Sequence, residues 1–102
     1  MEMYSLDKLL TFSKKSHTKN VFFESDTLKA QVMGLETGQA ISPCRMDHDV
    51  IFVVMEGEGK IIVDGEEEAI KKASWVFVPR EKETRSLKAR TKMAVLAIQV
   101  KS

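Results

Sequence analysis

Residues 50–70, VIFVVMEGEGKIIVDGEEEAI, limit the fold more than any other stretch of the chain. Two apolar runs rich in valine and isoleucine are separated by Gly57 and Gly59, and the second run ends at the pair Asp64-Gly65. An Asp-Gly pair between two β-rich runs is typical of a type I′ hairpin turn. The stretch therefore predicts consecutive antiparallel strands joined by tight turns.

The same alternation of short strands and turns continues through most of the chain. The exception is residues 5–12, where Ser5 as N-cap and leucines at helical spacing predict a helix of one or two turns. With 102 residues and 43% apolar side chains, the chain has room for one domain with one core. We therefore expect an all-β, single-domain sandwich or barrel with a short N-terminal helix or turn. Further strand-like runs lie at residues 20–26, 27–35, 75–78 and 93–100.

Several of these runs are apolar on both faces. Residues 51–55, 61–63 and 75–78 show no polar alternation, whereas a strand with water on one side should alternate. The outer face of part of the sheet is therefore expected to be covered by the N-terminal segment, by a second subunit, or by both. For the second subunit we predict a two-fold homodimer.

The expected dimer interface includes an aromatic pair. If Val76 and Val78 face the core, Trp75 and Phe77 on the same strand must face outward. Outward aromatic side chains most often mark a subunit interface and less often a ligand platform. The predicted interface residues are Trp75, Phe77, Ile51 and Val53.

Composition excludes several classes of protein. Lysine and arginine number 16 against 15 acidic residues, for a net charge of +1, which argues against a general nucleic-acid binder. One cysteine excludes an internal disulfide, and no apolar run is long enough for a signal-peptide core or a membrane span. We expect a soluble cytoplasmic protein without nucleic-acid or membrane partners.

Charge is unevenly distributed along the chain. Residues 56–68 contain six acids and one base, and residues 80–92 contain six bases and two acids. The simpler interpretation is that both segments are solvated loops or strand edges. The alternative is an anion-attracting mouth, or complementary patches across a dimer.

The segment PCRMDHD, residues 43–49, places Cys44, Met46 and His48 at alternating positions, which share one face of a strand. Thiolate, thioether and imidazole are ligands for copper or zinc, although a fourth ligand is not evident and the distance to His17 is not defined by the sequence. The simpler interpretation is packing, since cysteine and methionine are adaptable core residues. A third is a Cys44 nucleophile activated by His48.

Two glycines frame this segment at a recognisable spacing. Gly38 is followed after five residues by Cys44-x-Met46, then after three by Val50 and after six by Gly57. This resembles the first cupin motif, which is Gly, five residues, His-x-His, three or four residues, Glu, six residues, Gly. The second cupin motif is Gly, five residues, Pro-x-Gly, two residues, His, three residues, Asn. It falls on Ala73, Pro79, Glu81, Thr84 and Lys88. The resemblance covers about residues 28–100 and rests on spacing, glycines, Pro79 and apolar rhythm.

The resemblance implies a small RmlC-like cupin, a double-stranded β-helix or jelly-roll barrel, in which residues 27–102 form the barrel. Residues 1–26 would then pack on the barrel or on a dimer partner. The four positions of the standard cupin metal ligands hold Cys44, Met46, Val50 and Thr84, so the resemblance implies that all four ligands are replaced. No cofactor is therefore expected, and copper or zinc bound by Cys44, Met46 and His48 is the alternative.

The function expected from this resemblance is a small-molecule-binding or regulatory barrel for a sugar, a sugar phosphate or an organic acid. Thr84, Ser86 and Lys88 share one strand parity, so facing inward they would offer hydroxyls and an ammonium, whereas an outward Lys88 would be in water. The alternatives are an isomerase- or epimerase-like enzyme or metal-dependent oxygenase built on Cys44 and His48, and a structural dimerising module. The candidate pocket residues are Cys44, Met46, His48, Val50, Thr84 and Lys88.

Overall fold

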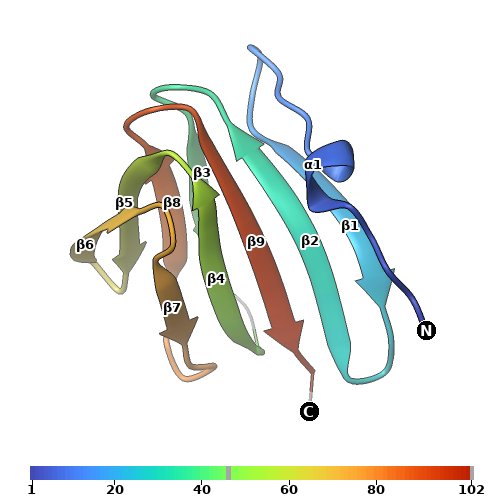
Figure 1. Cartoon of the computed structure of the whole chain (residues 1–102). Coiled ribbons are helices and arrows are strands. Elements are labelled where there is room, and N and C mark those ends of the chain that lie inside the picture. The colour runs from blue at the N-terminus through green and yellow to red at the C-terminus, as the bar shows by residue number, and fades with distance from the viewer. Residues whose placement is uncertain (46, 102) are drawn as a thin grey trace.

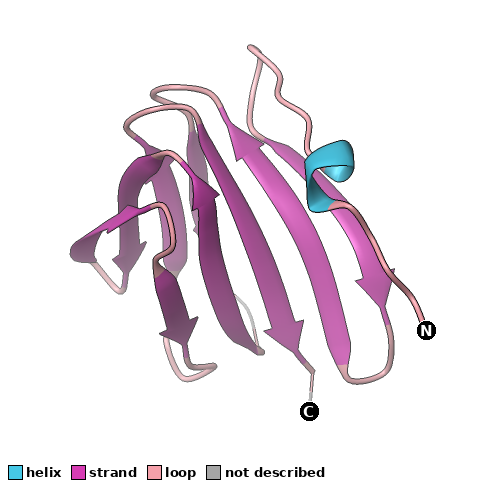
Figure 2. Ribbon diagram, viewed as in Figure 1, coloured by secondary structure: helices cyan, strands magenta, loops and turns pink. Residues whose placement is uncertain are grey.

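The computed structural model describes residues 1–45 and 47–101, and almost all of their regular structure is β-strand (Figure 2). A one-turn helix, α1 (Leu6–Leu9), precedes the strands. Among the described residues no helix has the length and apolar character needed to cross a membrane. The strands in chain order are β1 (Thr18–Glu24), β2 (Leu28–Leu35), β3 (Ala40–Cys44), β4 (Asp49–Glu56), β5 (Glu58–Val63), β6 (Glu66–Lys71), β7 (Trp75–Val78), β8 (Arg85–Ala89) and β9 (Met93–Val100).

The strands form two antiparallel sheets that face each other (Figure 1). A five-stranded sheet has the order β1-β2-β9-β4-β7, and a four-stranded sheet has the order β3-β8-β5-β6. Neighbouring strands come from distant parts of the sequence, because β9 lies between β2 and β4 and β8 lies between β3 and β5. The all-β fold with a short N-terminal helix, predicted from the sequence, is confirmed.

The core fills the space between the sheets with side chains at alternate strand positions. From the five-stranded sheet, Leu35, Val54 and Val95 are at most 1% exposed. Leu87 and Ile61 reach the same cluster from the four-stranded sheet. Burial of such side chains is the main force that holds the two sheets together.

The expected hairpin turn between β5 and β6 is present. Asp64 and Gly65 have φ angles of 48° and 84°, and a type I′ turn requires positive φ at both positions. The turn explains why β5 and β6 pair directly, with Val63 opposite Glu66.

Gly57, between β4 and β5, permits a close approach that a larger residue would prevent. Its φ is +80°, and a Cβ there would lie 2.0 Å from the carbonyl oxygen of Lys92. We expect Gly57→Ala to lower the free energy of unfolding by about 3 kcal/mol, since strain and overpacking act together. Gly65→Ala is the matched control, because Gly65 has a φ of +84° but open space around it. This substitution should lower the free energy of unfolding by about 1 kcal/mol. Urea denaturation of both variants measures the difference, and equal losses would contradict the steric argument.

The N-terminal segment covers one part of the outer face of the five-stranded sheet. Figure 1 shows α1 over β1 and β2, and the Asn20 side-chain amide donates to the Leu9 carbonyl at 3.1 Å. The Thr18 hydroxyl donates to the Thr11 carbonyl. Val32, which pairs with Asn20 in the sheet, is 1% exposed. Because β1 is itself a sheet strand, the residues that lie over the sheet are those before Thr18.

The other end of the same outer face is exposed. Trp75 and Phe77 on β7 are 62% and 47% exposed and stack with their ring centroids 6.5 Å apart, while Val78 is buried. In the register of the sheet, Trp75 lies opposite Val53 and Phe77 opposite Ile51. We refer to Ile51, Val53, Trp75 and Phe77 as the β4–β7 face. The outward aromatic pair expected from the alternation of this strand is therefore present.

Candidate binding site in the barrel interior

A cavity of about 120 Å³ lies between the two sheets. Its basic residues come from three strands and the loop before β1, and they are His17, Lys19, Lys29 and Arg85. No aspartate or glutamate is among the described residues that line it. The interior is therefore electropositive, and such a field attracts anions.

An apolar surface forms much of the cavity wall. Met33 from β2, Val50 and Phe52 from β4, Leu87 from β8 and Ala97 from β9 all line it, and each is at most 6% exposed. Apolar walls with a few polar groups are typical of small-molecule sites, because the polar groups then fix the orientation of the ligand.

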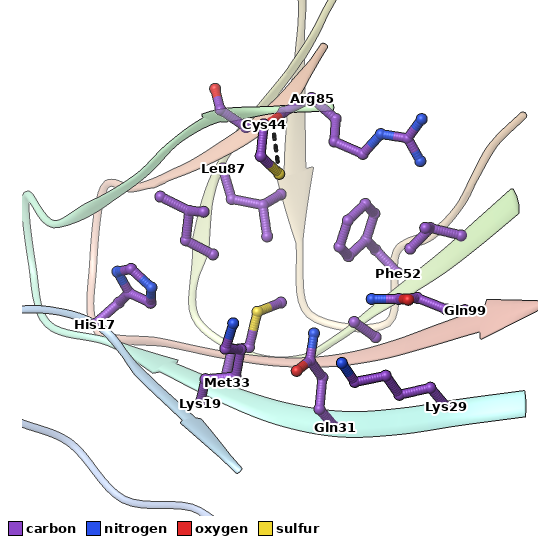
Figure 3. A pocket seen from close by; sticks show the side chains of 14 residues that line it. His17, Lys19, Lys29, Gln31, Met33, Cys44, Phe52, Arg85, Leu87 and Gln99 are labelled. Carbon is purple, nitrogen blue, oxygen red and sulfur yellow. Dashed lines mark hydrogen bonds between the residues drawn. The ribbon is translucent and has the colours of Figure 1, made fainter. Parts of the chain in front are cut away.

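One wall carries amide and ammonium groups, and we refer to Lys29, Gln31 and Gln99 as the amide wall. Lys29 lies directly opposite Gln99 in the pairing of β2 with β9, and Gln31 is two residues further on the same face. Figure 3 shows the side-chain nitrogens of these three residues directed toward the cavity. Gln31 and Gln99 are each 7% exposed, and Gln31 Oε1 is buried without a hydrogen-bond partner among the described residues.

Arg85 lies on the facing wall, on β8 (Figure 3). It is 2% exposed, and its Nη1 and Nη2 donate to the carbonyl oxygens of His48 at 3.2 Å and Lys82 at 3.3 Å. Nε is buried without a hydrogen-bond partner among the described residues, and no described carboxylate forms a salt bridge with this guanidinium. The described hydrogen-bond partners of this guanidinium are neutral carbonyls, so its burial carries a desolvation cost, which the nearby charge of Asp49 reduces without a described hydrogen bond.

An ion pair holds the two loops that supply these carbonyls. The Arg80 backbone N–H donates to Asp49 Oδ1 at 2.8 Å, and Arg80 Nη2 lies 3.3 Å from Asp49 Oδ2. These side-chain and backbone hydrogen bonds from Arg80 lower the pKa of Asp49, and the nearby charge of Arg85 acts in the same direction. His48 and Lys82 each lie close in sequence to one member of this pair, so the pair positions the carbonyls that hold Arg85.

The structure brings only some of the residues proposed from the sequence to the cavity. Cys44 and Val50 line it, with Cys44 exposed and its Sγ 3.8 Å from the Arg85 carbonyl oxygen. His48 does not line the cavity and contributes its backbone carbonyl to Arg85. Met46 lies outside the described residues.

The two candidates from the second motif lie away from the cavity. Thr84 is exposed and precedes β8, where its N–H donates to Asp64 Oδ1 at 2.8 Å. Lys88 is exposed on β8 and does not line the cavity, whereas Ser86 does. The inward side chains at this end of β8 are those of Arg85 and Leu87, which are 2% and 1% exposed.

The described residues do not fit a metal centre. No group of three or more histidine, cysteine, aspartate or glutamate side chains in the described part of the chain is arranged to hold an ion. The recorded hydrogen bond of the Cys44 thiol goes to a backbone carbonyl and not to a histidine.

The acidic and basic segments of the sequence partly pair within the chain. Lys60 lies 2.9 Å from Glu67, and Arg90 lies 3.6 Å from Glu58. Of the six bases in segment 80–92, Arg85 alone is among the described residues that line the cavity. The basic character of the cavity thus depends mainly on residues before β3.

Sequence reasoning missed the most informative residues, which are Arg85, Gln31 and Gln99. A signal was present, because Gln31 alternates with Met33 and Arg85 alternates with Leu87 on inward-facing positions. A polar residue at an inward position of a barrel strand needs a partner inside the barrel. The sequence did not reveal which strand parity faces inward.

Similarity to known proteins is strong in structure and weak in sequence. No family model matches the chain. An uncharacterized protein of Aquifex aeolicus (strain VF5) is 35% identical over 34 residues, which is 33% of this chain and 28% of that protein. The chain thus matches much less than two thirds of this relative.

Two solved structures define the likeness in fold. An RmlC-like cupin protein from Desulfovibrio desulfuricans superposes with a TM-score of 0.89 at 20% identity, over 99% of this chain and 97% of that one. Salicylate 1,2-dioxygenase from Pseudoaminobacter salicylatoxidans, solved in complex with gentisate, gives a TM-score of 0.78 at 21% identity. That match covers 83% of this chain and 25% of the dioxygenase chain. Identities this low show a shared fold, and the fold of this chain is the cupin-type jelly roll.

Proposed function

We propose that the chain is a small-molecule-binding barrel whose interior binds an organic anion. The observation that carries this proposal is Arg85, which is 2% exposed and forms no salt bridge with a described carboxylate. A bound anion would balance this charge and supply an acceptor for the unpaired Nε. The energetic cost of the unpaired arginine would then be offset by ligand binding.

The other basic groups support the same ligand charge. His17, Lys19 and Lys29 line the cavity together with Arg85, and no described acidic residue does. An anion entering between the sheets would meet favourable potential from several directions. Gln99 on the amide wall adds a neutral N–H donor of the kind that fixes a carboxylate.

The size of the cavity favours an organic acid over a sugar or a sugar phosphate. A cavity of about 150 Å³ in another protein is known to bind benzene, and this one has about 120 Å³. A hexose or a sugar phosphate has many more non-hydrogen atoms than benzene and would not be enclosed. A carboxylate with a short carbon chain fits the volume, and its chain would contact Phe52 and Leu87.

An enzyme remains the second candidate. Cys44 is exposed at the wall of the same cavity, so its thiol is accessible to a bound molecule. A dioxygenase shares the fold, but fold alone does not transfer an activity. The described residues form no metal cluster, and the Cys44 thiol has no histidine as a hydrogen-bond partner.

The proposal predicts selective stabilisation by small carboxylates. Acetate, propionate and butyrate should raise the melting temperature through preferential binding to the folded state, whereas glycerol, glucose and glucose 6-phosphate should not. Differential scanning calorimetry at constant ionic strength, with sodium chloride as the control salt, measures this. Equal shifts with chloride and with the carboxylates would contradict a specific anion site.

We also propose that the β4–β7 face binds a second copy of this chain. Trp75 and Phe77 are exposed, and Ile51 and Val53 beside them extend the apolar surface. β7 is an edge strand of the five-stranded sheet, so its outer side is open to further packing. The N-terminal segment lies over β1 and β2 at the opposite end of the sheet. An apolar patch of this kind most often marks an interface.

A further inference from the structure

We infer, resting on the proposed anion-binding function, that the ligand is a small hydroxy acid, with a carboxylate and a hydroxyl in one molecule. A hydroxy acid has a second functional group beside its carboxylate, and one residue of the cavity recognises it. That residue is Gln31.

Gln31 presents an unsatisfied amide to the cavity. It is 7% exposed and lines the cavity, and its Oε1 is buried without a hydrogen-bond partner among the described residues. A buried polar atom without a partner is rare in native proteins, so an ordered water or a bound molecule normally completes its hydrogen bonding. A carboxylate alone cannot complete it, because an ionised carboxylate only accepts hydrogen bonds.

The choice of ligand follows from the orientation of the amide, in which the acceptor Oε1 is the buried atom without a described partner. A side-chain amide has one acceptor oxygen and one donor NH₂ group, and each needs a partner of the opposite kind. The group that satisfies both is one that donates and accepts, and a hydroxyl does so with a single oxygen. The charged groups near the amide supply the partner for the carboxylate.

The positions of the basic residues allow both groups of one molecule to be bound. Lys29 lies two residues from Gln31 on the same face of β2, and Arg85 lies on the facing wall (Figure 3). Arg85 Nε and Gln31 Oε1 are the buried side-chain atoms left without partners in the described part of the chain, and both residues line this one cavity. One is a cationic donor and the other an acceptor, which is the complement of a hydroxy acid. The volume of about 120 Å³ limits the ligand to a short carbon chain.

The test compares acids that differ by one hydroxyl group. Isothermal titration calorimetry with lactate and propionate, and with 3-hydroxybutyrate and butyrate, should show that at least one hydroxy acid binds about tenfold or more tightly than its deoxy partner. The reason is that the deoxy acid leaves the Gln31 acceptor buried and unpaired. Glycerol, which has hydroxyls and no carboxylate, should not bind.

Two variants of Gln31 distinguish the hydroxyl contact from anion binding. Gln31→Met should weaken binding of the hydroxy acid to the level of its deoxy partner and leave the deoxy acid unchanged. Gln31→Glu keeps the size of the side chain but adds a negative charge, so it should weaken both acids.

The outcomes separate the two proposals. Equal affinities of each hydroxy acid and its deoxy partner, or equal weakening of both by Gln31→Met, would overturn the hydroxy-acid inference while anion binding stands. Binding of none of the four acids would overturn both. Circular dichroism confirms that each variant is folded before it is titrated.

Discussion

Replacing Arg85 by methionine is expected to abolish the stabilisation of this protein by small carboxylates. Arg85 is the buried cation of the cavity, and removing one partner of a buried charge pair typically costs about 2–5 kcal/mol of binding free energy. That corresponds to a loss of affinity of about 30-fold or more. Calorimetric titration of the parent and the variant with the best-binding acid measures the ratio.

The same variant should fold at least nearly as well as the parent without ligand. Methionine has an apolar side chain that follows the path of the arginine stem, and replacing a buried ionic group by an apolar one is often neutral or stabilising. The two carbonyls that Arg85 leaves behind belong to His48, which is partly buried, and Lys82, which is exposed, so water can reach their loops. We expect a change in the free energy of unfolding within about 1 kcal/mol.

Lys88→Met is the matched control for Arg85→Met. Lys88 is a cation on the same strand, but it is exposed and does not line the cavity. Its loss should leave carboxylate binding unchanged apart from a small effect of net charge, which added salt removes. If Arg85→Met and Lys88→Met weaken binding equally, the anion site is not at Arg85.

Replacing Trp75 by glutamate is expected to convert a dimer into a monomer. Trp75 is 62% exposed in the single chain and stacks on Phe77 at the centre of the β4–β7 face. Buried aromatic side chains commonly contribute 2 kcal/mol or more to an interface, and a glutamate there would place an uncompensated charge against the partner. Light scattering should give about twice the chain mass of 11.5 kDa for the parent and the chain mass for the variant.

Val21→Glu serves as the control for this experiment. Val21 is also apolar and exposed, but it lies on β1 at the opposite edge of the five-stranded sheet. The Val21→Glu variant should therefore remain dimeric. A parent protein with the mass of one chain would contradict the dimer proposal, and dissociation by both variants would show that the interface is not at the β4–β7 face.

The fold followed from the sequence because its signals are local and repeated. The Asp64-Gly65 turn, the unbroken apolar runs and the short N-terminal helix each correspond to an element of the structure. What the sequence could not provide was the pairing of β2 and β4 with β9, because that pairing joins residues far apart in the chain. The spacing resembles the cupin motifs, and this resemblance implied a jelly roll, in which strands distant in sequence pair.

The site was less accessible to sequence reasoning. The resemblance drew attention to Cys44, Val50 and Thr84, and the first two do line the cavity while Thr84 does not. Arg85 lies next to Thr84 in sequence, and the side chains of adjacent strand residues face opposite sides. The motif spacing placed the inward side chain at Thr84, whereas the buried side chain is that of Arg85. Solvated lysines and arginines are common, and only burial identifies Arg85 as unusual.

The central place of β9 has a consequence for how the protein folds. β9 is the last strand in the described chain, yet it joins β2 to β4, and without it the two halves of the five-stranded sheet have no hydrogen bonds to each other. Such long-range pairing makes folding slow compared with that of helical proteins of similar size, since distant segments must meet first. Gln99 and Ala97 on this strand also line the cavity. The cavity and the five-stranded sheet therefore both require β9 in place, so a ligand bound in the cavity would report that β9 has paired with β2 and β4.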